Sequence, residues 1–328
     1  MERMPIVLTQ PTVSVIIVTW KSREAVTKCL NSLGALEVPF PLETIVVDNF
    51  SDDGTSQALL KVKESLPNIR LKLILNEGNI GLSKATGQAY GVATGEWILL
   101  CNPDIVFTSD FVSMVSFARS QNEYSLLAAE MVNLDGSLQR MVIRRFPTVA
   151  GVFFSFSALG YHLDKFLLRN FFRDHCAYSR VRFKEPVSPV DQPGASFLLL
   201  SRDAVKRIGG IFSLEFPIWW NDVDLAKRAH ESGIKRGVMP SIRISHEQGG
   251  SAKMLARPER RYLFCQSMAR YCKKWKMHPR LVQTLFFFDG LFNAAVGWPL
   301  WILQFGLDTG LHGALGYSES QIRGVLTG

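Results

Sequence analysis

The chain contains 328 residues, of which 47% are hydrophobic and 20% are charged. These proportions exclude an intrinsically disordered protein, and the length is sufficient for one large domain or two modest ones. The net charge of +8 favours an anionic partner, such as a phosphorylated small molecule or an anionic lipid. Nucleic acid is not expected, because the sequence has no nucleic-acid-binding motif and its basic residues lie in short, scattered clusters.

The cysteine pattern and the amino-terminal sequence both favour a cytoplasmic location. The five cysteines are odd in number and have no zinc-type spacing, so reduced thiols are the plainest interpretation. Residues 1–10 are too short and too polar for a signal peptide. No apolar run before residue 280 approaches the length of a membrane span.

Short apolar runs alternate with longer segments in the amino-terminal third of the chain. The runs rich in β-branched residues are predicted to be buried strands, at 13–18, 43–47, 69–75 and 96–100. The segments between them are predicted to be helices, at 22–33, about 55–66 and 83–93. Strands that alternate with helices at this spacing are typical of an α/β fold, with a mostly parallel, doubly wound central sheet flanked by helices.

The regular pattern resumes after an irregular middle segment. Residues 142–185 carry many aromatic and basic side chains but few clear periods, so we interpret them as a long excursion or a lid. Beyond them we predict a strand at 196–200, and helices at 203–208 and 222–232.

Polar side chains follow three of the predicted strands. Thr19 and Asp48 come directly after the first two. The fourth must end before Pro103, which cannot donate to a sheet, so Asn102 and Asp104 lie just beyond it. Because ligands bind at the carboxyl ends of strands in open α/β sheets, we expect these side chains to converge on one crevice, where the carboxylate of Asp104 requires a cation or a hydrogen-bond donor. The alternative is that Asp104 caps a helix from a surface turn.

A second cluster of aromatic and acidic residues lies at the start of the predicted helix 222–232. Trp219 and Trp220 directly precede Asn221 and Asp222. A carboxylate beside an aromatic wall is a candidate general base. The alternative is that Asp222 only caps the helix. Asp224, which lies two residues farther on, would then face elsewhere and bind basic side chains structurally.

A lone histidine is the third candidate. His246 lies in the sequence SHEQGGS at 245–251, after a short strand-like segment. A histidine in a glycine-rich turn can bind a metal or a phosphate group, although many such residues serve only in packing. The glycines suggest a close approach of the backbone to a ligand such as a diphosphate.

In their order and spacing, these segments resemble glycosyltransferase family 2, the inverting enzymes with the GT-A fold. The resemblance extends from about residue 13 to residue 271, and it is nearest to the rhamnosyltransferase-like and galactofuranosyltransferase-like subgroup of cell-wall and surface polysaccharide assembly. The segments that carry it are VSVIIVTW at 13–20, VVDNFSDDGT at 46–55, NEGNIGLSKA at 76–85, GEWILLCNPD at 95–104, GASFLLLSRDAVKRIGGI at 194–211, WWNDVDLAKRAHESG at 219–233 and SHEQGGS at 245–251.

The resemblance implies roles for individual residues. It implies that Asp222 is the catalytic base, and that Asp104 and His246 bind Mg²⁺ or Mn²⁺ on the donor diphosphate. Trp220 and Asp224 would bind the acceptor. The residues implied to bind the nucleotide sugar are Thr19, Asp48, Asn76, Lys84, Asn102, Gly194 and Ala195.

Three positions depart from the family's pattern. Asn102 begins the motif that is DXD in the family, which is usual in this subgroup. Asn221 replaces the first acid of the pair that ends in the catalytic base. Thr86-Gly87 occupies a stretch that is often rich in asparagine, so the specificity for donor and acceptor stays open.

The resemblance therefore implies an enzyme that transfers a sugar with inversion from a nucleotide-diphosphate donor to a hydroxyl of a lipid-linked or polysaccharide acceptor. The best candidate donor is deoxythymidine diphosphate-rhamnose, and a galactofuranosyl or other hexosyl donor is the alternative. A non-catalytic protein that binds sugar nucleotides is a third hypothesis, motivated by Asn221. A dinucleotide-binding dehydrogenase is disfavoured, because no GxGxxG follows the first strand.

We expect a GT-A domain at 1–272, with a nucleotide-binding half at about 11–110 and an acceptor-binding half at 111–272, and a helical apolar extension at 273–328. The apolar segment 281–307 is marginal for a membrane span. It is expected to pack in the core or against a second subunit, or to lie on the cytoplasmic face of a membrane. The basic residues that favour the membrane surface are Lys273, Lys274, Lys276 and Arg280.

Overall fold

The computed structural model of the protein describes residues 12–66, 69–121, 123–133, 135–139, 142–178, 181–246 and 257–295. The strands are β1 (Val13–Thr19), β2 (Leu42–Asp48), β3 (Arg70–Leu75), β4 (Trp97–Cys101), β5 (Ile105–Val106), β6 (Leu126–Val132), β7 (Ser188–Pro189), β8 (Phe197–Ser201) and β9 (Arg236–His246). The helices are α1 (Arg23–Gly34), α2 (Thr55–Ser65), α3 (Leu82–Val92), α4 (Asp110–Ser120), α5 (Val149–Phe156), α6 (Ala158–Phe166), α7 (Phe171–Cys176), α8 (Arg202–Arg207), α9 (Asn221–Glu231), α10 (Arg257–Lys274) and α11 (Pro279–Ala295).

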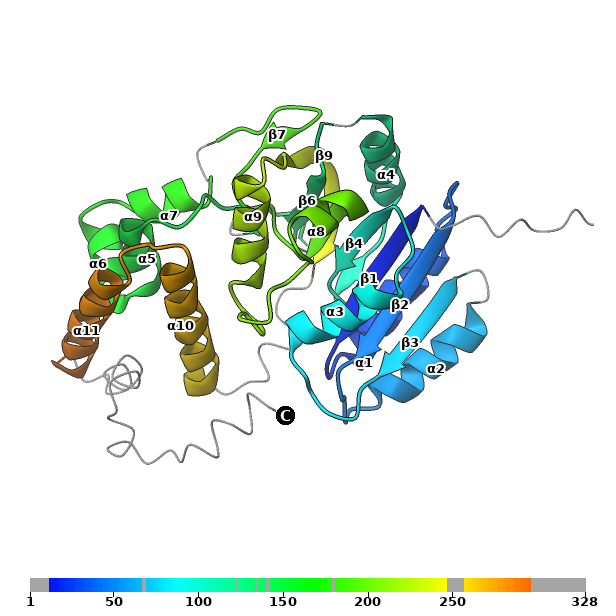
Figure 1. Cartoon of the computed structure of the whole chain (residues 1–328), viewed down its shortest axis with the longest axis horizontal. Helices are drawn as coiled ribbons and strands as arrows, with labels where there is room; N and C mark the ends of the chain where they lie inside the picture. Colours follow the sequence, from blue (N-terminus) through cyan, green and yellow to red (C-terminus); the bar gives the residue numbers. More distant parts are fainter. Residues whose placement is uncertain are drawn as a thin grey trace, which may run out of the picture.

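A single sheet forms the centre of the larger of two lobes (Figure 1). Its strand order is β3-β2-β1-β4-β8-β6-β9-β5, with β7 paired to β9. The strands from β3 to β4 are parallel neighbours, as predicted. β8 is antiparallel to both β4 and β6, so the other half of the sheet is mixed. The reversal arises because the chain reaches β8 after the long segment 142–185 and not through a single crossover helix.

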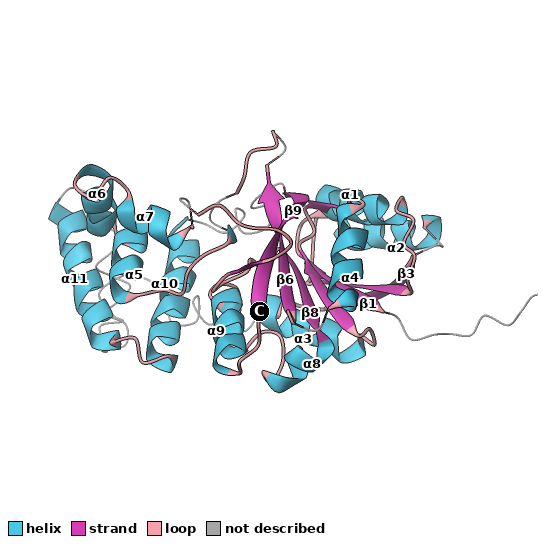
Figure 2. Cartoon of the chain, turned by 90° about the horizontal axis from the view of Figure 1, so that it is seen from above, coloured by secondary structure: helices cyan, strands magenta, loops and turns pink. Residues whose placement is uncertain are grey.

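Helices cover both faces of the sheet (Figure 2). Leu30 of α1, Leu59 of α2 and Phe111 of α4 are fully buried on one face. On the other face, α3 presents Ala85 and Ala89, both fully buried, and α8 and α9 lie beside it. The small side chains of α3 allow it to pack directly on the strands. The α/β fold with a helix-flanked central sheet is thus confirmed, although α4 and β6 were not predicted from the sequence.

The segment 142–185, predicted to be a long excursion or a lid, contains three short helices. These helices, α5, α6 and α7, join α10 and α11 in a second lobe (Figures 1 and 2). Val152 of α5, Tyr271 of α10 and Phe286 of α11 are buried in one apolar cluster. The helices are only six to nine residues long, which explains why the sequence showed no clear period there.

The described part of the apolar carboxyl-terminal segment belongs to this lobe. The predicted domain boundary after residue 272 lies inside α10. Val282 and Phe286 of α11 are buried, and Asp289 Oδ1 accepts a hydrogen bond of 2.6 Å from Leu159 N. No helix within the described ranges is long and apolar enough to span a membrane. Residues 296–328, which include part of the segment considered for membrane contact, lie outside the described residues.

A buried carboxylate holds β1, β2 and β3 together at the end of the sheet opposite to the strand-end turns. Glu43, whose side chain is 1% exposed, accepts from Lys72 Nζ at 2.8 Å, Ser14 Oγ at 2.6 Å and Thr94 N at 2.6 Å. Gly95 N donates to Ser14 Oγ at 2.8 Å. A Cβ at Gly95 would lie 2.6 Å from Ser14 N, so only glycine allows this approach.

The stability of the protein is expected to depend on pH through Glu43. Burial raises the pKa of Glu43, but hydrogen bonds from Lys72, Ser14 and Thr94 outweigh it and lower the pKa from 4.5 to about 2. Because the pKa is lower in the folded state, the stabilisation is complete above the unfolded value of 4.5 and is lost as the pH falls toward 2. Between about pH 6 and about pH 3, the free energy of unfolding of the wild type should fall by about 2 kcal/mol more than that of Glu43→Gln. Urea denaturation at both pH values measures this difference. Equal losses for the two proteins would contradict this role.

Candidate active site

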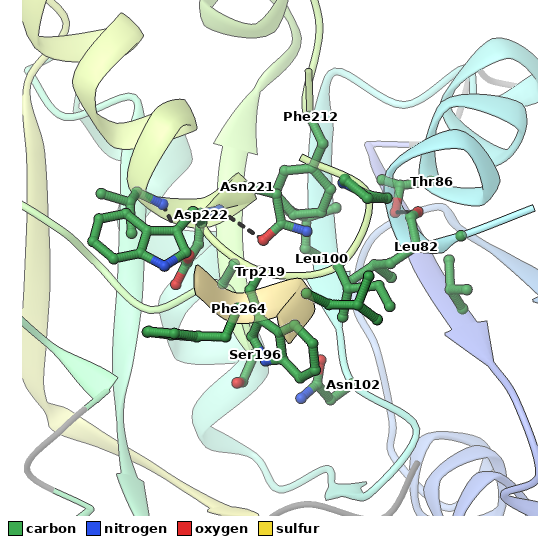
Figure 3. Close-up of a pocket in the computed structure, with 18 of the residues that line it drawn as sticks. Leu82, Thr86, Leu100, Asn102, Ser196, Phe212, Trp219, Asn221, Asp222 and Phe264 are labelled. Atoms are coloured by element: carbon green, nitrogen blue, oxygen red, sulfur yellow. Dashed lines mark hydrogen bonds between the residues drawn. The ribbon is translucent and has the colours of Figure 1, made fainter. Parts of the chain in front are cut away.

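A cavity of about 760 Å³ lies between the sheet and the helical lobe, at the carboxyl ends of β1 and β4. Sites for small ligands usually measure about 300–1,000 Å³. One wall consists of the turns that follow β1, β2 and β4, and the other consists of parts of α5 and α10 and the start of α9. Figure 3 shows side chains from both walls, among them Asn102 and Asp222, around the same space. The sequence predicted a ligand site at this edge of the sheet.

Some of the predicted site residues line this cavity and others do not. Those that line it are Thr19, Asn102, Asp104, Ala195, Trp220 and Asp222. Those that lie outside its lining within the described residues are Asp48, Asn76, Lys84, Gly194, Asp224 and His246. His246 nevertheless contacts two of the lining residues directly.

The turn that contains Pro103 meets the end of β9 at His246. Ile105 pairs with His246 in the sheet, so the register places Asp104 beside the imidazole. Asp104 Oδ1 lies 3.3 Å from His246 Nε2, yet this buried oxygen has no hydrogen-bond partner in the described part of the chain. Asn102 Nδ2 lies 3.2 Å from the same ring nitrogen. An unpaired carboxylate oxygen that faces a ring nitrogen is an arrangement that a cation would complete.

Gln139, which the sequence analysis did not single out, determines which nitrogen of His246 faces Asp104. Gln139 Nε2 donates to His246 O at 2.7 Å and to Asn133 Oδ1 at 2.9 Å, so Gln139 Oε1 faces His246 Nδ1 at 2.9 Å. Because an amide oxygen can only accept, the neutral imidazole carries its proton on Nδ1, and Nε2 accepts from Asn102 Nδ2 beside Asp104 Oδ1. This is how metal-binding histidines are usually oriented.

The donor set fits a divalent cation that the substrate helps to hold. Asp104 supplies an oxygen and His246 supplies a nitrogen. Over the described ranges, no group of three or more His, Cys, Asp or Glu side chains could hold a metal ion. Mg²⁺ and similar ions are often bound by one or two carboxylates together with substrate phosphates, so a diphosphate would complete this shell.

Asp222 lies in the opposite wall, at the start of α9. Its Oδ1 accepts from Val223 N at 2.9 Å, and its Oδ2 accepts from Arg144 Nη2 at 2.7 Å. The side chains of Asp222 and Arg144 stay 25% and 26% exposed. Arg144 was not predicted, because it is 78 residues away in the sequence. The two hydrogen bonds fix the orientation of the carboxylate and leave it accessible from the cavity.

An aromatic wall surrounds the start of α9. Trp220 is 5% exposed and packs against Tyr271 and Phe264, with ring centroids 5.1 Å and 5.8 Å away. Its φ of +66° is unusual for a bulky residue and points to a functional constraint on this turn. Burial raises the pKa of Tyr271, so its hydroxyl stays protonated. The predicted combination of an acid and a partly apolar wall is therefore present.

Two cysteines line the cavity but are poor nucleophiles. Burial raises the pKa of Cys101 well above its usual value, and the neighbouring Cys29 and Asp104 raise it further. Burial also raises the pKa of Cys176. Since the thiolate is the reactive form of cysteine, neither residue is suited to form a covalent intermediate.

Asp224 points away from the cavity and is fully buried. Its Oδ2 accepts from Arg228 Nε at 2.8 Å, while its Oδ1 lies 2.9 Å from Lys274 Nζ and 3.1 Å from Trp275 Nε1. Two residues along a helix correspond to a rotation of about 200°, so Asp222 and Asp224 face in different directions. The structure favours the alternative interpretation of Asp224, in which it binds basic side chains and ties α9 to α10.

Asparagines provide the polar surface after β2 and β3. Both oxygens of Asp48 accept hydrogen bonds, from Ser51 Oγ and Ser56 Oγ, and its side chain is buried behind the lining. Asn49 and Asn79 line the cavity and are joined by a hydrogen bond of 2.7 Å. They were not predicted, although the strand-end argument that selected Asp48 applies equally to Asn49.

The remaining predicted donor residues support the lining or lie apart from it. Asn76 Nδ2 donates to Asn49 Oδ1 at 3.1 Å, so it orients a residue that lines the cavity. Lys84 is exposed on α3. A Cβ at Gly194 would lie 2.1 Å from Val142 Cγ1, so glycine allows two segments to meet directly beside Ala195.

Solved structures of glycosyltransferases share this fold. A mannosyltransferase from Pyrobaculum calidifontis, in complex with GDP-Man and Mn²⁺, aligns with a TM-score of 0.54 and 18% identity over 98% of this chain and 85% of that chain. S. aureus TarS 1-349, in complex with UDP-GlcNAc, aligns with a TM-score of 0.50 and 17% identity over 95% of this chain and 78% of that chain. The fold is therefore the GT-A fold of glycosyltransferases.

Sequence comparison identifies the family. The profile of Glycosyl transferase family 2 matches residues 14–206, so the chain belongs to this family and is a glycosyltransferase, as predicted. The N-acetylglucosaminyl-diphospho-decaprenol L-rhamnosyltransferase of Mycobacterium tuberculosis is 26% identical over 251 residues, which cover 72% of this chain and 76% of the relative. An uncharacterized protein of Sinorhizobium fredii is 23% identical over 82% of this chain and 28% of its own length.

The two acids of α9 are expected to differ in their effects on stability. Asp224→Asn should lower the free energy of unfolding by about 3 kcal/mol, because it removes a fully buried carboxylate from its ion pairs with Arg228 and Lys274. Asp222→Asn breaks a partly exposed pair and should cost about 1 kcal/mol or less. Urea denaturation of both variants measures the difference, and similar losses would show that the two carboxylates do not have these separate roles.

Proposed function

We propose that the protein transfers a sugar, with inversion, from a nucleotide-diphosphate donor to a hydroxyl of a lipid-linked or polysaccharide acceptor, and that the sugar is rhamnose. The observation that carries this proposal is the placement of Asp104, which contacts His246 behind the lining, in one wall of a single cavity and of Asp222 in the other. The rhamnosyltransferase relative from M. tuberculosis, whose name specifies a diphospho-decaprenol acceptor, supports the choice of sugar and acceptor.

The first wall binds the donor in this proposal. Thr19, Asn49 and Asn79 would contact the nucleoside, because they line the cavity beside the ends of β1 to β3. Asp104 and His246 would hold Mg²⁺ or Mn²⁺ on the diphosphate. When bound, such an ion stabilises the negative charge that develops on the departing nucleoside diphosphate. Mn²⁺ together with GDP-Man in the P. calidifontis mannosyltransferase supports this assignment.

The second wall activates the acceptor. A sugar hydroxyl is a poor nucleophile until a base removes its proton. Asp222 would accept that proton while the hydroxyl oxygen attacks the anomeric carbon from the face opposite to the departing diphosphate, which inverts the configuration. Arg144 and Val223 N hold the carboxylate in position for this transfer.

Two alternatives lead to different results in simple assays. A galactofuranosyl or other hexosyl donor would be revealed by a thermal-shift screen of nucleotide sugars with Mn²⁺, in which the true donor stabilises most. A non-catalytic sugar-nucleotide-binding protein would bind a donor but release no nucleoside diphosphate from it. The accessible Asp222 favours an enzyme over a binding protein.

Replacement of the base should separate binding from turnover. Asp222→Asn preserves the shape of the side chain, so Kd for the donor is expected to stay unchanged while transfer falls by roughly 10²–10⁴-fold. Release of nucleoside diphosphate in the presence of acceptor measures turnover, and titration calorimetry measures binding. Asp203→Asn, at an exposed position on α8, is the control. Unchanged transfer in Asp222→Asn would remove this residue from the role of base.

Replacement of the metal ligand should weaken only the Mn²⁺-dependent part of binding. Asp104→Asn is expected to raise Kd for the nucleoside diphosphate about tenfold or more with Mn²⁺ present, and to leave Kd unchanged in EDTA, because the amide carries no charge for the cation. Calorimetric titrations under both conditions test this. The assignment is wrong if Mn²⁺ enhances binding equally in the wild type and the variant.

We further propose that the helical lobe contacts the cytoplasmic face of a membrane, where a lipid-linked acceptor would be found. Five consecutive residues at the end of α6 and in the turn that follows it, Lys165-Phe166-Leu167-Leu168-Arg169, are all exposed. Phe166 is 69% and Leu167 is 72% exposed. Apolar side chains flanked by cations match the boundary between anionic headgroups and acyl chains. Phe287 and Phe288 of α11 are also more than half exposed and add to the apolar surface of this lobe.

Vesicle flotation tests this contact with a matched control. Leu167→Glu should reduce binding to vesicles that contain phosphatidylglycerol about tenfold, because it removes apolar area and adds repulsion. Leu214→Glu changes an equally exposed leucine of the other lobe, 71% against 72%, and should have no effect. Equal flotation of all three proteins would contradict the membrane contact. So would a wild-type dimer that Leu167→Glu dissociates without any change in flotation, because the apolar residues would then bind a second subunit.

A further inference from the structure

Several side chains of the cavity lining carry a buried polar atom without a partner among the described residues, and three of them, Gln192, Trp220 and Asn221, adjoin Asp222 or its partner Arg144. Gln192 is 4% exposed, and Trp220 and Asn221 are each 5% exposed. Gln192 Oε1, Trp220 Nε1 and Asn221 Nδ2 have no hydrogen-bond partner among the residues that the structure describes. All three residues line the cavity. Since an unpaired buried polar group is costly, such groups in a cavity indicate that a ligand satisfies them.

The orientation of each group is fixed by its other contacts. Gln192 Nε2 donates to Arg145 O at 2.7 Å, which leaves Oε1 as the free end of the amide. Asn221 Oδ1 accepts from Asp222 N at 2.8 Å, the bond drawn in Figure 3, which leaves Nδ2 as the free end. The ring of Trp220 is held between Tyr271 and Phe264. The three atoms are therefore preorganised and not free to turn toward other partners.

The chemistry of the three groups matches neutral hydroxyls. They offer one acceptor and two donors, and none of them carries a charge. A phosphate would require cations, and the two arginines of the lining have other partners: Arg144 donates to Asp222 at 2.7 Å, and Arg145 Nε donates to His175 O at 3.2 Å. A hydroxyl both donates and accepts, so the hydroxyls of a sugar suit the acceptor as well as the donors. The aromatic rings of Trp219 and Phe264 also line the cavity, and they suit the apolar face of a sugar ring.

We propose that Gln192, Trp220 and Asn221 form a subsite that recognises the hydroxyl groups of the sugar held next to Asp222, and that this subsite sets the sugar specificity of the enzyme. The inference rests on the proposed function, because it places a sugar beside the catalytic base. That sugar is either the one carried by the donor or the one that carries the acceptor hydroxyl. A subsite of this kind discriminates strongly between sugars, because a sugar that lacks the matching hydroxyl leaves the buried polar groups unpaired.

The test uses two variants that each change one unpaired atom and a control outside the cavity. Trp220→Phe removes the Nε1 donor and retains an aromatic ring. Asn221→Asp retains the oxygen that accepts from Asp222 N and replaces the unpaired Nδ2 donor with an acceptor. This variant alone is sufficient for the test if Trp220→Phe does not fold. Thr44→Val removes another buried, unpaired polar atom, Oγ1, at a fully buried position outside the cavity lining.

Titration calorimetry with Mn²⁺ compares deoxythymidine diphosphate-rhamnose with deoxythymidine diphosphate alone. If the subsite binds the donor sugar, Trp220→Phe and Asn221→Asp should raise Kd for the nucleotide sugar about threefold to tenfold. Kd for the nucleoside diphosphate should stay unchanged. If the subsite binds the acceptor sugar, Kd for the nucleotide sugar and Kd for the diphosphate should both stay unchanged. KM for a short-chain N-acetylglucosaminyl diphospho-polyprenol should then rise about threefold to tenfold. Thr44→Val should match the wild type throughout.

Two results would overturn the inference. If both variants match the wild type in donor affinity and in acceptor KM, the proposed subsite is wrong and the proposed function is unaffected. A wild-type protein that binds no member of a nucleotide-sugar panel more tightly than the corresponding nucleoside diphosphate, and transfers no sugar, would remove the proposed function and the subsite together.

Discussion

The cavity depends on how the turn after β4 is held between two strands. Asn102 N donates to Ser196 O at 2.9 Å, which attaches the start of the turn to the segment that leads into β8. Pro103 then ends the strand, and Ile105 pairs with His246 of β9. Residues 102–105 therefore pass from a contact beside β8 to a pairing with β9 within four residues. Asp104 directly precedes Ile105, so the pairing of Ile105 with His246 places the carboxylate beside the imidazole.

The constraint extends from this turn into the rest of the molecule. Gln139, which follows β6, bonds to both the backbone and the ring of His246. The end of β6 and the end of β9 are thus joined at the place where the acid and the imidazole meet. The sheet provides a rigid support for the wall that would hold a nucleoside diphosphate, and rigidity of this kind is what a preorganised site requires.

The opposite wall has a different origin. It is built from the start of α9, from α5 and from α10, which belong largely to the helical lobe. Helical periodicity directs Asp222 into the cavity and Asp224 into the ion pairs that tie α9 to α10. One acid is thus available for proton transfer because the other anchors the helix. The rings of Trp220, Phe264 and Tyr271 pack together beside Asp222 and make this wall partly apolar.

Local sequence patterns predicted the strands and helices of the amino-terminal half, because those elements carry strong periodicity and end at clear breakers such as Pro103. They also selected Asp104 and Asp222. They could not predict Arg144, whose role depends on a contact with Asp222 across 78 residues, or Gln139, which is 107 residues from His246. The antiparallel direction of β8 and the helices of 142–185 were missed for a related reason: long-range packing determines them and local propensity does not.

The proposed roles of Asp104 and His246 can be tested by a crystal structure with a divalent cation and a nucleoside diphosphate. Crystals grown with Mn²⁺ and deoxythymidine diphosphate would be measured at the manganese absorption edge. If Asp104 and His246 hold the cation, we expect an anomalous peak in contact with both side chains and with the diphosphate oxygens. A peak coordinated by other side chains, or a well-ordered diphosphate in the cavity with no peak beside it, would show that these residues do not bind the metal.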